Sequence, residues 1–225
     1  MKAYRSGERL LAAYLSTITG FIDALGFMYL GGYFLSFMSG NTTRLTTGLT
    51  EGDLEVVGKA GGLMMLFLIG VAIGALISQL GERHLPPTRT REAILLFICL
   101  TSVIASIGVV VGNPTLAVLS LSFTVGAMNS TFERDGEVSI SLTYMTGTLV
   151  KMAQRFVGAF FGESHRGWLM YLTQWAALAL GAIIGGFSYV HLGLYSVWVV
   201  TGLLIAGTVV ALAYRQWRRN RRLPV

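Results

Sequence analysis

Charged side chains are scarce in this sequence of 225 residues. Only 12% of the residues are Asp, Glu, Lys or Arg, whereas 53% are hydrophobic and 28 are glycine. A soluble domain of this size carries about 25% charged residues. The composition therefore excludes an ordinary soluble domain and indicates a protein of the lipid bilayer.

Residues that bind metals or perform covalent chemistry are also few. Cys99 is the only cysteine and lies inside an apolar run, which excludes a disulfide framework and a thiolate metal site. His84, His165 and His191 are far apart and lack carboxylates at ligand spacing. There is no G-x-S-x-G elbow, no H-E-x-x-H motif and no Walker loop. We therefore expect no metal, no cofactor and no enzymatic activity.

Long apolar runs are what the sequence has in abundance. Four of them are long enough to cross about 30 Å of hydrocarbon at about 20 residues each, and two more are expected to do so. The four are 10–30, 60–80, 93–112 and 168–190, and the other two are 115–132 and 194–214. No small-residue cleavage pattern follows the first run, so we expect it to be a retained helix and not a signal peptide.

The 17 basic residues leave a net charge of +6, and eleven of them lie in three clusters at the ends of these runs and not along a soluble face. This is the distribution of the cytoplasmic loops of a membrane protein. It predicts that both termini are cytoplasmic, that the basic side chains meet lipid headgroups, and that the protein does not bind nucleic acid. The clusters are Lys2, Arg5 and Arg9; Arg83, Arg89 and Arg91; and Arg215, Arg218, Arg219, Arg221 and Arg222.

The segment 36–49, with the sequence SFMSGNTTRLTTGL, places an arginine and six hydroxyl residues between apolar flanks, and it has a second copy. Residues 143–152, TYMTGTLVKM, align with 36–45 at an offset of 107 residues, which pairs Gly40 with Gly147 and Arg44 with Lys151. Internal similarity of this kind indicates a duplication.

The similarity extends beyond the two segments. Residues 20–23 precede 126–129 by 106 residues, and the pair Gly70 and Gly74 precedes Gly181 and Gly185 by 111 residues. Duplicated halves of roughly a hundred residues are common in transporters. We therefore divide the chain into a first repeat, 1–112, and a second repeat, 113–225. The paired glycines have the spacing that lets membrane helices pack closely.

We call 36–49 and its second copy, within 138–160, the two special segments, and they decide the topology. Residues 41–49 would form a helix of only about 13 Å, which cannot cross a membrane. If the amino terminus and the basic cluster at 83–91 are both cytoplasmic, the chain crosses the membrane an even number of times between them. The runs 10–30 and 60–80 supply two crossings, so the first special segment must return to the side from which it entered. The same count, made between the cluster at 83–91 and a cytoplasmic carboxyl terminus, requires that 138–160 does not cross the membrane either. The predicted fold is an all-α membrane protein with six transmembrane helices in two inverted three-helix repeats, each with a re-entrant or broken segment. The alternative has eight spans and parallel halves, but it places the cluster at 83–91 outside.

We expect the two segments to meet near the midplane and to form a site for a solute. A helix amino terminus attracts anions, and each segment adds a cation one turn further along. Ser39 or Asn41 is expected to cap the first of these helices. The alternative is that the cations snorkel to the interface and the hydroxyls bond their own helix. The predicted binding residues are Ser39, Gly40, Asn41, Thr42, Arg44, Thr146, Gly147, Thr148 and Lys151.

Asp23 is the one acid well inside a spanning run. A carboxylate there is costly, so we expect it either to pair with a cation such as Arg44 or to carry a proton during transport. Asn129, its counterpart in the second repeat, cannot titrate. Any proton coupling through this pair would therefore be one-sided.

The residues GFID at 20–23, the core FLSFMSGNTTRL at 34–45 and the six apolar runs resemble the YoaK-like family of bacterial integral membrane proteins. The resemblance covers nearly the whole chain. It implies an inner-membrane protein of about six spans that is commonly labelled a permease. It implies no particular substrate and no site residues.

The sequence thus predicts a secondary permease for a small anionic or polar metabolite, with proton coupling as an option. Two alternatives stay open, namely a passive channel and a membrane scaffold that transports nothing. The glycine-rich helices also allow a homodimer, although no interface motif indicates one.

Overall fold

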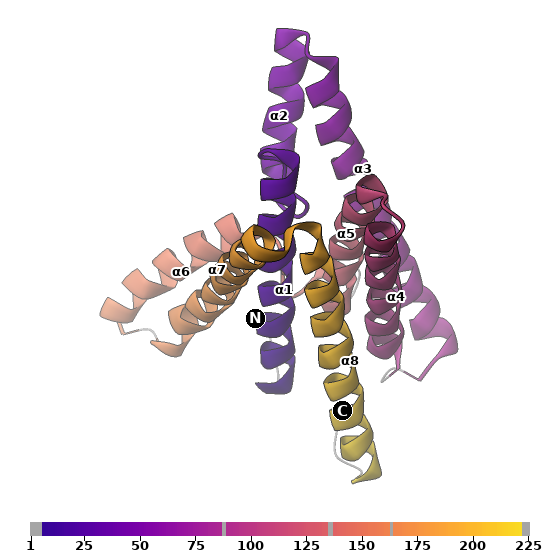
Figure 1. Cartoon of the computed structure of the whole chain (residues 1–225). Coiled ribbons are helices and arrows are strands. Elements are labelled where there is room, and N and C mark those ends of the chain that lie inside the picture. Colours follow the sequence, from indigo (N-terminus) through magenta and orange to yellow (C-terminus); the bar gives the residue numbers. More distant parts are fainter. Residues whose placement is uncertain (1–5, 87–88, 135–136, 163, 222–225) are drawn as a thin grey trace.

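A computed structural model describes residues 6–86, 89–134, 137–162 and 164–221, and these residues are almost entirely helical (Figure 1). The α-helices are α1 (Ser6–Leu30), α2 (Met38–Glu51), α3 (Leu54–His84), α4 (Thr90–Val110), α5 (Pro114–Met128), α6 (Met145–Phe160), α7 (Arg166–Leu192) and α8 (Ser196–Asn220). Two short 3₁₀ segments, η1 (Asn129–Phe132) and η2 (Gly193–Tyr195), extend α5 and join α7 to α8. The strands β1 (Glu133–Arg134) and β2 (Glu137–Val138) form a minimal antiparallel hairpin.

The long helices coincide with the predicted apolar runs. Five helical stretches among the described residues are long and apolar enough to cross a membrane, and the last of them, Gly167–Asn220, contains both α7 and α8. All six predicted runs therefore lie in helical segments, although 93–112 extends past the end of α4 at Val110. The prediction of an all-α membrane protein is confirmed.

Helices α1 and α7 cross closely through glycines. A Cβ atom on Gly181 would lie 1.8 Å from the carbonyl oxygen of Thr17, and one on Gly185 would lie 2.5 Å from that of Phe21. Gly20 meets α7 in the same way, at 2.0 Å from the carbonyl oxygen of Leu178. Because the contact positions advance together along both helices, α1 and α7 run in the same direction.

Helices α3 and α5 make the matching contact. A Cβ atom on Gly70 would lie 2.2 Å from the carbonyl oxygen of Phe123, and one on Gly126 would lie 2.2 Å from that of Phe67. A Cβ atom on Gly74 would lie 3.0 Å from the carbonyl oxygen of Ala127, four residues after Phe123, so these two helices also run in the same direction. No other residue type could occupy these glycine positions without moving the backbones apart.

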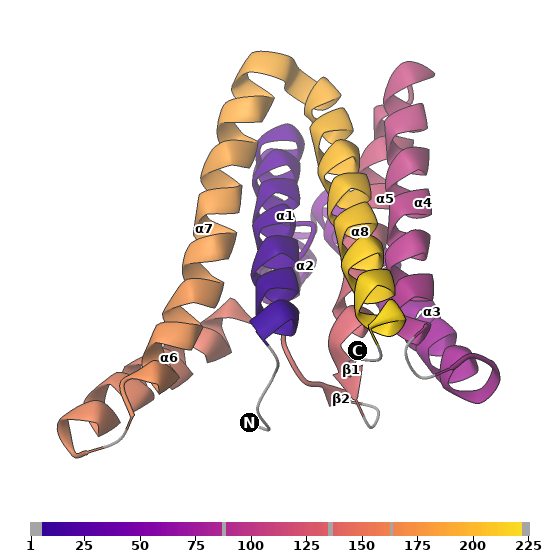
Figure 2. The same cartoon turned by 90° about the horizontal axis from the view of Figure 1, so that it is seen from below.

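Hydroxyl contacts give the direction of the remaining helices. Ser106 of α4 lies 2.8 Å from the Thr201 hydroxyl of α8, and Cys99 donates to Thr208 over 3.2 Å, so α4 and α8 are antiparallel. The Tyr14 hydroxyl of α1 donates to the Leu203 carbonyl of α8 over 2.6 Å, and Gly7 faces Tyr214, so this pair is antiparallel too. Helices α1, α4 and α7 thus run one way, and α3, α5 and α8 run the other (Figure 2).

Helices α2 and α6 lie outside this bundle. Each folds back along the helix that follows it, α2 through a 3.8 Å contact of Thr42 with Met64, and α6 through the rings of Phe156 and Trp168. Few of their residues are buried: Asn41 and Gly48 in α2, and Thr148 in α6. Figure 1 shows the two hairpins as arms that reach away from the other helices in different directions.

The core is built around α1 and α5. In the spanning windows, 56% of the α1 residues and 72% of the Pro114–Phe132 residues are buried, against 28% for α3. Phe21, Leu25, Leu121 and Leu204 are among the buried side chains that pack together. The central helices therefore carry the packing, and the outer helices present apolar faces to lipid.

The glycine crossings give a stability prediction. Gly181→Ala should lower the unfolding temperature in detergent, because the added methyl overlaps the α1 backbone, and overpacking of this kind costs about 1–3 kcal/mol or more. Gly186→Ala is the matched control on the same helix, since its Cβ would meet only the Met28 sulfur at 3.7 Å. Equal unfolding temperatures for the two variants would contradict the crossing.

Candidate functional site

Asp23 anchors the loop that follows α1. Gly31 and Gly32 have φ values of 70° and 102°, and they turn the chain back along the bundle. The Oδ1 atom of Asp23 then accepts hydrogen bonds from the backbone N–H groups of Leu35 and Ser36, both at 2.8 Å. Asp23 lies seven residues before the end of α1, so the loop descends about 10 Å before α2 returns. Residues 31–37 therefore turn back beside α1 before α2 begins at Met38.

Asn41 holds the other side of this loop. Its side chain is fully buried, with Oδ1 accepting from the Phe34 N–H at 3.0 Å and Nδ2 donating to the Phe34 carbonyl at 2.7 Å. The prediction that Asn41 or Ser39 caps the helix is wrong. Helix α2 begins earlier, at Met38, after Phe37, which makes no side-chain cap. The Asn41 amide bonds the loop because the irregular backbone there has no helical or strand partner.

A third side chain that bonds this loop comes from α5. The Ser122 hydroxyl lies 3.4 Å from the Leu35 carbonyl and 3.2 Å from the Leu63 carbonyl, and it is buried between them. The loop is therefore held from α1, α2 and α5 at once. This shared anchoring fixes the position at which α2 starts.

The second special segment is anchored in a similar way. The Oδ1 atom of Asn129 accepts from the Thr143 hydroxyl at 3.2 Å, and Leu142 and Thr143 are buried like Leu35 and Ser36 in the first copy. Thr148 is buried where the first copy has Asn41, and its hydroxyl bonds the Tyr144 carbonyl at 3.2 Å. Asn129 thus bonds the second segment through a neutral amide that accepts one hydroxyl bond, where Asp23 accepts two backbone N–H bonds.

Arg44 folds back over the first loop and does not reach Asp23. Its guanidinium carbon lies 4.7 Å from the centre of the Tyr33 ring, and a Cβ atom on Gly32 would lie 2.4 Å from one of its nitrogens. Neither Arg44 nor Asp23 belongs to an ion pair in the described part of the chain. The expected Asp23–Arg44 pairing is therefore not formed, because the carboxylate is already used by backbone N–H groups.

A cavity of about 360 Å³ opens beside this loop, between the end of α1, the start of α5 and α3. Tyr29, Lys59 and Thr115 supply its polar lining, and Leu63 and Val118 lie among its apolar walls. The Leu63 carbonyl is bonded by Ser122, which also holds the loop, so the cavity lies next to the anchored segment. Lys59 pairs with Glu55 at 2.5 Å on the exposed side.

The structure thus gathers Arg44 and Lys59 at the same end of the bundle, where Tyr33 lies under Arg44 and within electrostatic reach of Lys59. Sequence reasoning selected Arg44 but missed Tyr29, Tyr33, Lys59 and Thr115. The one available signal was that Lys59 stands at the start of an apolar run, immediately after an acidic loop.

The threonine hydroxyls near the start of α2 bond carbonyls of their own helix. The Thr42 hydroxyl donates to the Met38 carbonyl at 2.8 Å, and Thr43 donates to that of Ser39 at 3.2 Å. Ser39 and Thr42 are exposed, and Gly40 packs against the rings of Phe37 and Phe34. These contacts match the alternative that hydroxyls in membrane segments bond the preceding turn.

The predicted residues of α6 lie elsewhere. Thr146, Gly147 and Lys151 are exposed on the arm formed by α6, and a Cβ atom on Gly147 would meet nothing within 4 Å. Helices α2 and α6 do not pack against each other. The structure therefore does not bring the two predicted sets together in one central site, because the segments are anchored at different ends of the bundle and their helices point outward.

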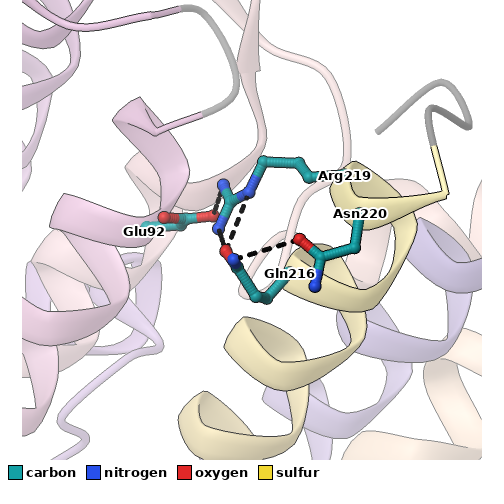
Figure 3. A network of polar contacts seen from close by, with 4 residues as sticks. All are labelled: Glu92, Gln216, Arg219 and Asn220. Carbon is teal, nitrogen blue, oxygen red and sulfur yellow. Dashed lines mark hydrogen bonds and ion pairs between the residues drawn. The ribbon is translucent and has the colours of Figure 1, made fainter.

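Two ion pairs tie the opposite end of the bundle together. Glu8 of α1 pairs with Arg91 of α4 at 3.1 Å, and Glu92 of α4 pairs with Arg219 of α8 at 2.5 Å (Figure 3). Gln216 accepts from Arg219 at 2.8 Å and donates to Asn220 at 3.3 Å. The paired side chains are between 13% and 25% exposed, so these contacts are shielded from bulk water and less screened by salt.

Metal chemistry has no support in the described residues, which contain no group of three His, Cys, Asp or Glu side chains placed to hold an ion.

Comparison with known proteins places the chain among transmembrane proteins. A family model described as "Protein of unknown function (DUF1275)" matches residues 11–210. A UPF0700 transmembrane protein of Rhizobium meliloti (strain 1021) is 33% identical over 220 residues, which cover 97% of this chain and 92% of that protein. The UPF0700 transmembrane protein YoaK of Bacillus subtilis (strain 168) is 25% identical over 209 residues, which cover 88% and 89%. No solved structure matches.

The anchoring of the first loop can be tested through Asp23. Asp23→Asn should keep the fold, because an amide oxygen can accept both of the N–H bonds that the carboxylate accepts. Asp23→Leu should unfold at a lower temperature in detergent, because two buried N–H groups lose their acceptor at about 1–3 kcal/mol each. A Leu variant as stable as the Asn variant would show that the loop does not depend on this side chain.

Proposed function

Because the chain belongs to the DUF1275 family, as its resemblance to YoaK indicated, and its relatives are bacterial transmembrane proteins, we propose that it is a secondary permease for a small anionic or polar metabolite. The observation that carries this proposal is the cavity with Arg44 and Lys59 near it, at one end of a bundle whose other end is closed by ion pairs. A bundle open at one end and closed at the other is what alternating access requires of each of its states.

The proposed permease is built from two inverted repeats, 1–112 and 113–225. The glycine contacts of α1 with α7 have counterparts, residue by residue, in those of α5 with α3. Under the same correspondence, the bond of Asp23 to the Leu35–Ser36 backbone matches that of Asn129 to Thr143. Each long helix of the first repeat runs opposite to its counterpart in the second, α1 to α5, α3 to α7 and α4 to α8, which supports six spans over eight.

The cavity end is the outer one in this proposal, because the other end carries the arginine-rich helix termini that favour the cytoplasm. Lys59 already has a carboxylate partner in Glu55, whereas Arg44 has only the Tyr33 ring among the described residues. A carboxylate or phosphate group of the solute would supply the missing acceptors, and guanidinium binds such groups through paired hydrogen bonds. This preference for an anion is consistent with the class of solute expected from the sequence.

Proton coupling would act through the loop beside the cavity. A proton on Asp23 would weaken it as the acceptor for Leu35 and Ser36, and the loop would then be held by Asn41 and Ser122 alone. Protonation would thus loosen the loop beside the cavity without breaking the bundle. For the solute to leave on the other side, the Glu8–Arg91 and Glu92–Arg219 pairs would have to separate.

The binding site is tested by a thermal-shift screen of the purified protein against small anionic metabolites. A ligand at a hundred times its dissociation constant stabilises the folded protein by about 2.7 kcal/mol. Arg44→Gln should abolish the shift produced by a hit, because the guanidinium is the proposed partner of the anion.

Lys151→Gln is the control for that screen, since it removes an exposed cation far from the cavity. A shift that survives in Arg44→Gln but disappears in Lys151→Gln would place the site elsewhere. Uptake into proteoliposomes then separates the alternatives: a permease saturates with solute, a passive channel does not saturate, and a scaffold moves nothing.

The coupling role of Asp23 has its own test. Uptake by the wild-type protein should increase when a pH gradient is imposed, and Asp23→Asn should transport without responding to the gradient, because the amide cannot carry the proton. Uptake is measured in proteoliposomes with and without the gradient, at equal protein content. A gradient response retained in Asp23→Asn would assign the proton to another group or to none.

A further inference from the structure

Arg215 of α8 carries a hydrogen-bond donor that the described part of the chain leaves without an acceptor. The residue stands one helical turn before Arg219, which turns toward α4 and reaches Glu92 (Figure 3). Its Nη1 atom is buried and has no hydrogen-bond partner among the described residues. Arg215 also belongs to none of the ion pairs in that part of the chain. A buried donor of this kind is uncommon in folded proteins and indicates a bound water or ion.

The charges around Arg215 favour an anion over a water molecule. Four charged groups lie within electrostatic reach of its guanidinium: Arg91, Glu92, Arg219 and Glu8. Both carboxylates already pair with another arginine, Glu8 with Arg91 at 3.1 Å and Glu92 with Arg219 at 2.5 Å. Three guanidinium groups therefore share two carboxylates, and Arg215 is the one without an ion pair.

The two neighbouring arginines are held in place by further bonds. Arg91 donates through Nε to the Thr131 carbonyl at 3.0 Å. Arg219 donates through Nε and Nη2 to the Gln216 side-chain oxygen, at 3.2 Å and 2.8 Å. Because these bonds fix both guanidinium groups, neither can turn away from Arg215 without losing a partner. An added negative charge would offset their repulsion of Arg215.

The site lies near one surface of the membrane. Arg215 stands five residues before Asn220, the last residue of α8, which is about 8 Å along the helix. Beside it, a Cβ atom on Gly7, near the start of α1, would lie 3.5 Å from the Tyr214 ring. Figure 2 shows α1 starting and α8 finishing at this end of the bundle. Basic pockets between spanning helices on the cytoplasmic side are places where phosphate headgroups bind.

We propose that Arg215, with Arg91 and Arg219 beside it, forms a binding site for a phosphate group between α1, α4 and α8. A guanidinium binds phosphate through two parallel hydrogen bonds, so the ligand accepts from the Nη1 atom that the described chain leaves unbonded. The phosphate belongs either to a lipid headgroup or to a soluble ion, and the two experiments below separate these sources. The site is at the opposite end of the bundle from the cavity and does not rest on the proposed transport.

The first experiment uses inorganic phosphate. The unfolding temperature of the full-length protein in detergent is measured in phosphate and in chloride at equal ionic strength, and phosphate should raise it. Arg215→Gln should increase the phosphate concentration needed for half of the shift by about tenfold or more, because it removes hydrogen bonds to a charged group. In chloride this variant should be no less stable than the wild type, since it removes a cation that repels two others.

Two single-charge variants are the controls. Arg221→Gln removes an exposed guanidinium that lies 4.5 Å from the centre of the Trp217 ring on the same helix, and it should keep the phosphate shift. Arg44→Gln removes the cation near the cavity and should also keep it. Equal losses in Arg221→Gln and Arg215→Gln would overturn the proposal in favour of net charge. A shift lost in Arg44→Gln and kept in Arg215→Gln would overturn it by placing the phosphate near the cavity.

The second experiment measures lipid retention. The protein is incubated with equal parts of phosphatidylglycerol and phosphatidylcholine, whose phosphate is neutralised by choline, and native mass spectrometry counts the lipids that stay bound. A preference for phosphatidylglycerol that Arg215→Gln loses and Arg221→Gln keeps identifies a lipid headgroup as the ligand. A phosphate shift that depends on Arg215 without such a preference identifies a soluble phosphate. If neither the shift nor the preference depends on Arg215, the proposal is wrong.

Discussion

The rest of this structure depends on one constraint. The backbone of a loop that belongs to neither a helix nor a strand must find hydrogen-bond partners. Residues 31–37 run back along α1, inside a bundle that spans a membrane, where an unpaired N–H or C=O group costs several kcal/mol. Asp23, Asn41 and Ser122 provide partners from three different helices. The polar residues that look most functional in the sequence are therefore first of all structural.

This anchoring explains why α2 and α6 behave alike although their sequences differ. Each helix follows a loop bonded by a polar side chain, Asp23 or Asn129, and each then turns outward along the next long helix. The first arm is rich in threonines that bond their own carbonyls, and the second carries basic and aromatic residues on opposite faces. One architectural device thus presents two different surfaces, at opposite ends of the bundle.

The two ends of the bundle also differ in their polar contacts. At one end, glycines turn the chain inward and leave a cavity near two cations, whereas at the other the termini of α1, α4 and α8 are tied by carboxylate–guanidinium pairs. Between them, the close glycine crossings hold α1 to α7 and α3 to α5 at backbone contact. In the proposed permease, the glycine crossings keep the middle of the bundle fixed, while the polar contacts at its two ends can form and break.

The sequence by itself determined the helical membrane class, the positions of the long helices and the family, because length and hydropathy of a span are local properties of the chain. It also pointed to Asp23 and Arg44, since a charge among apolar residues is visible without coordinates. It could not show that Asp23 bonds a loop instead of a cation, that Asn41 bridges Phe34 instead of capping a helix, or that Tyr29, Lys59 and Thr115 share a cavity. Those facts were decided by the tertiary structure, because they depend on which distant backbone groups the packed helices leave without a partner.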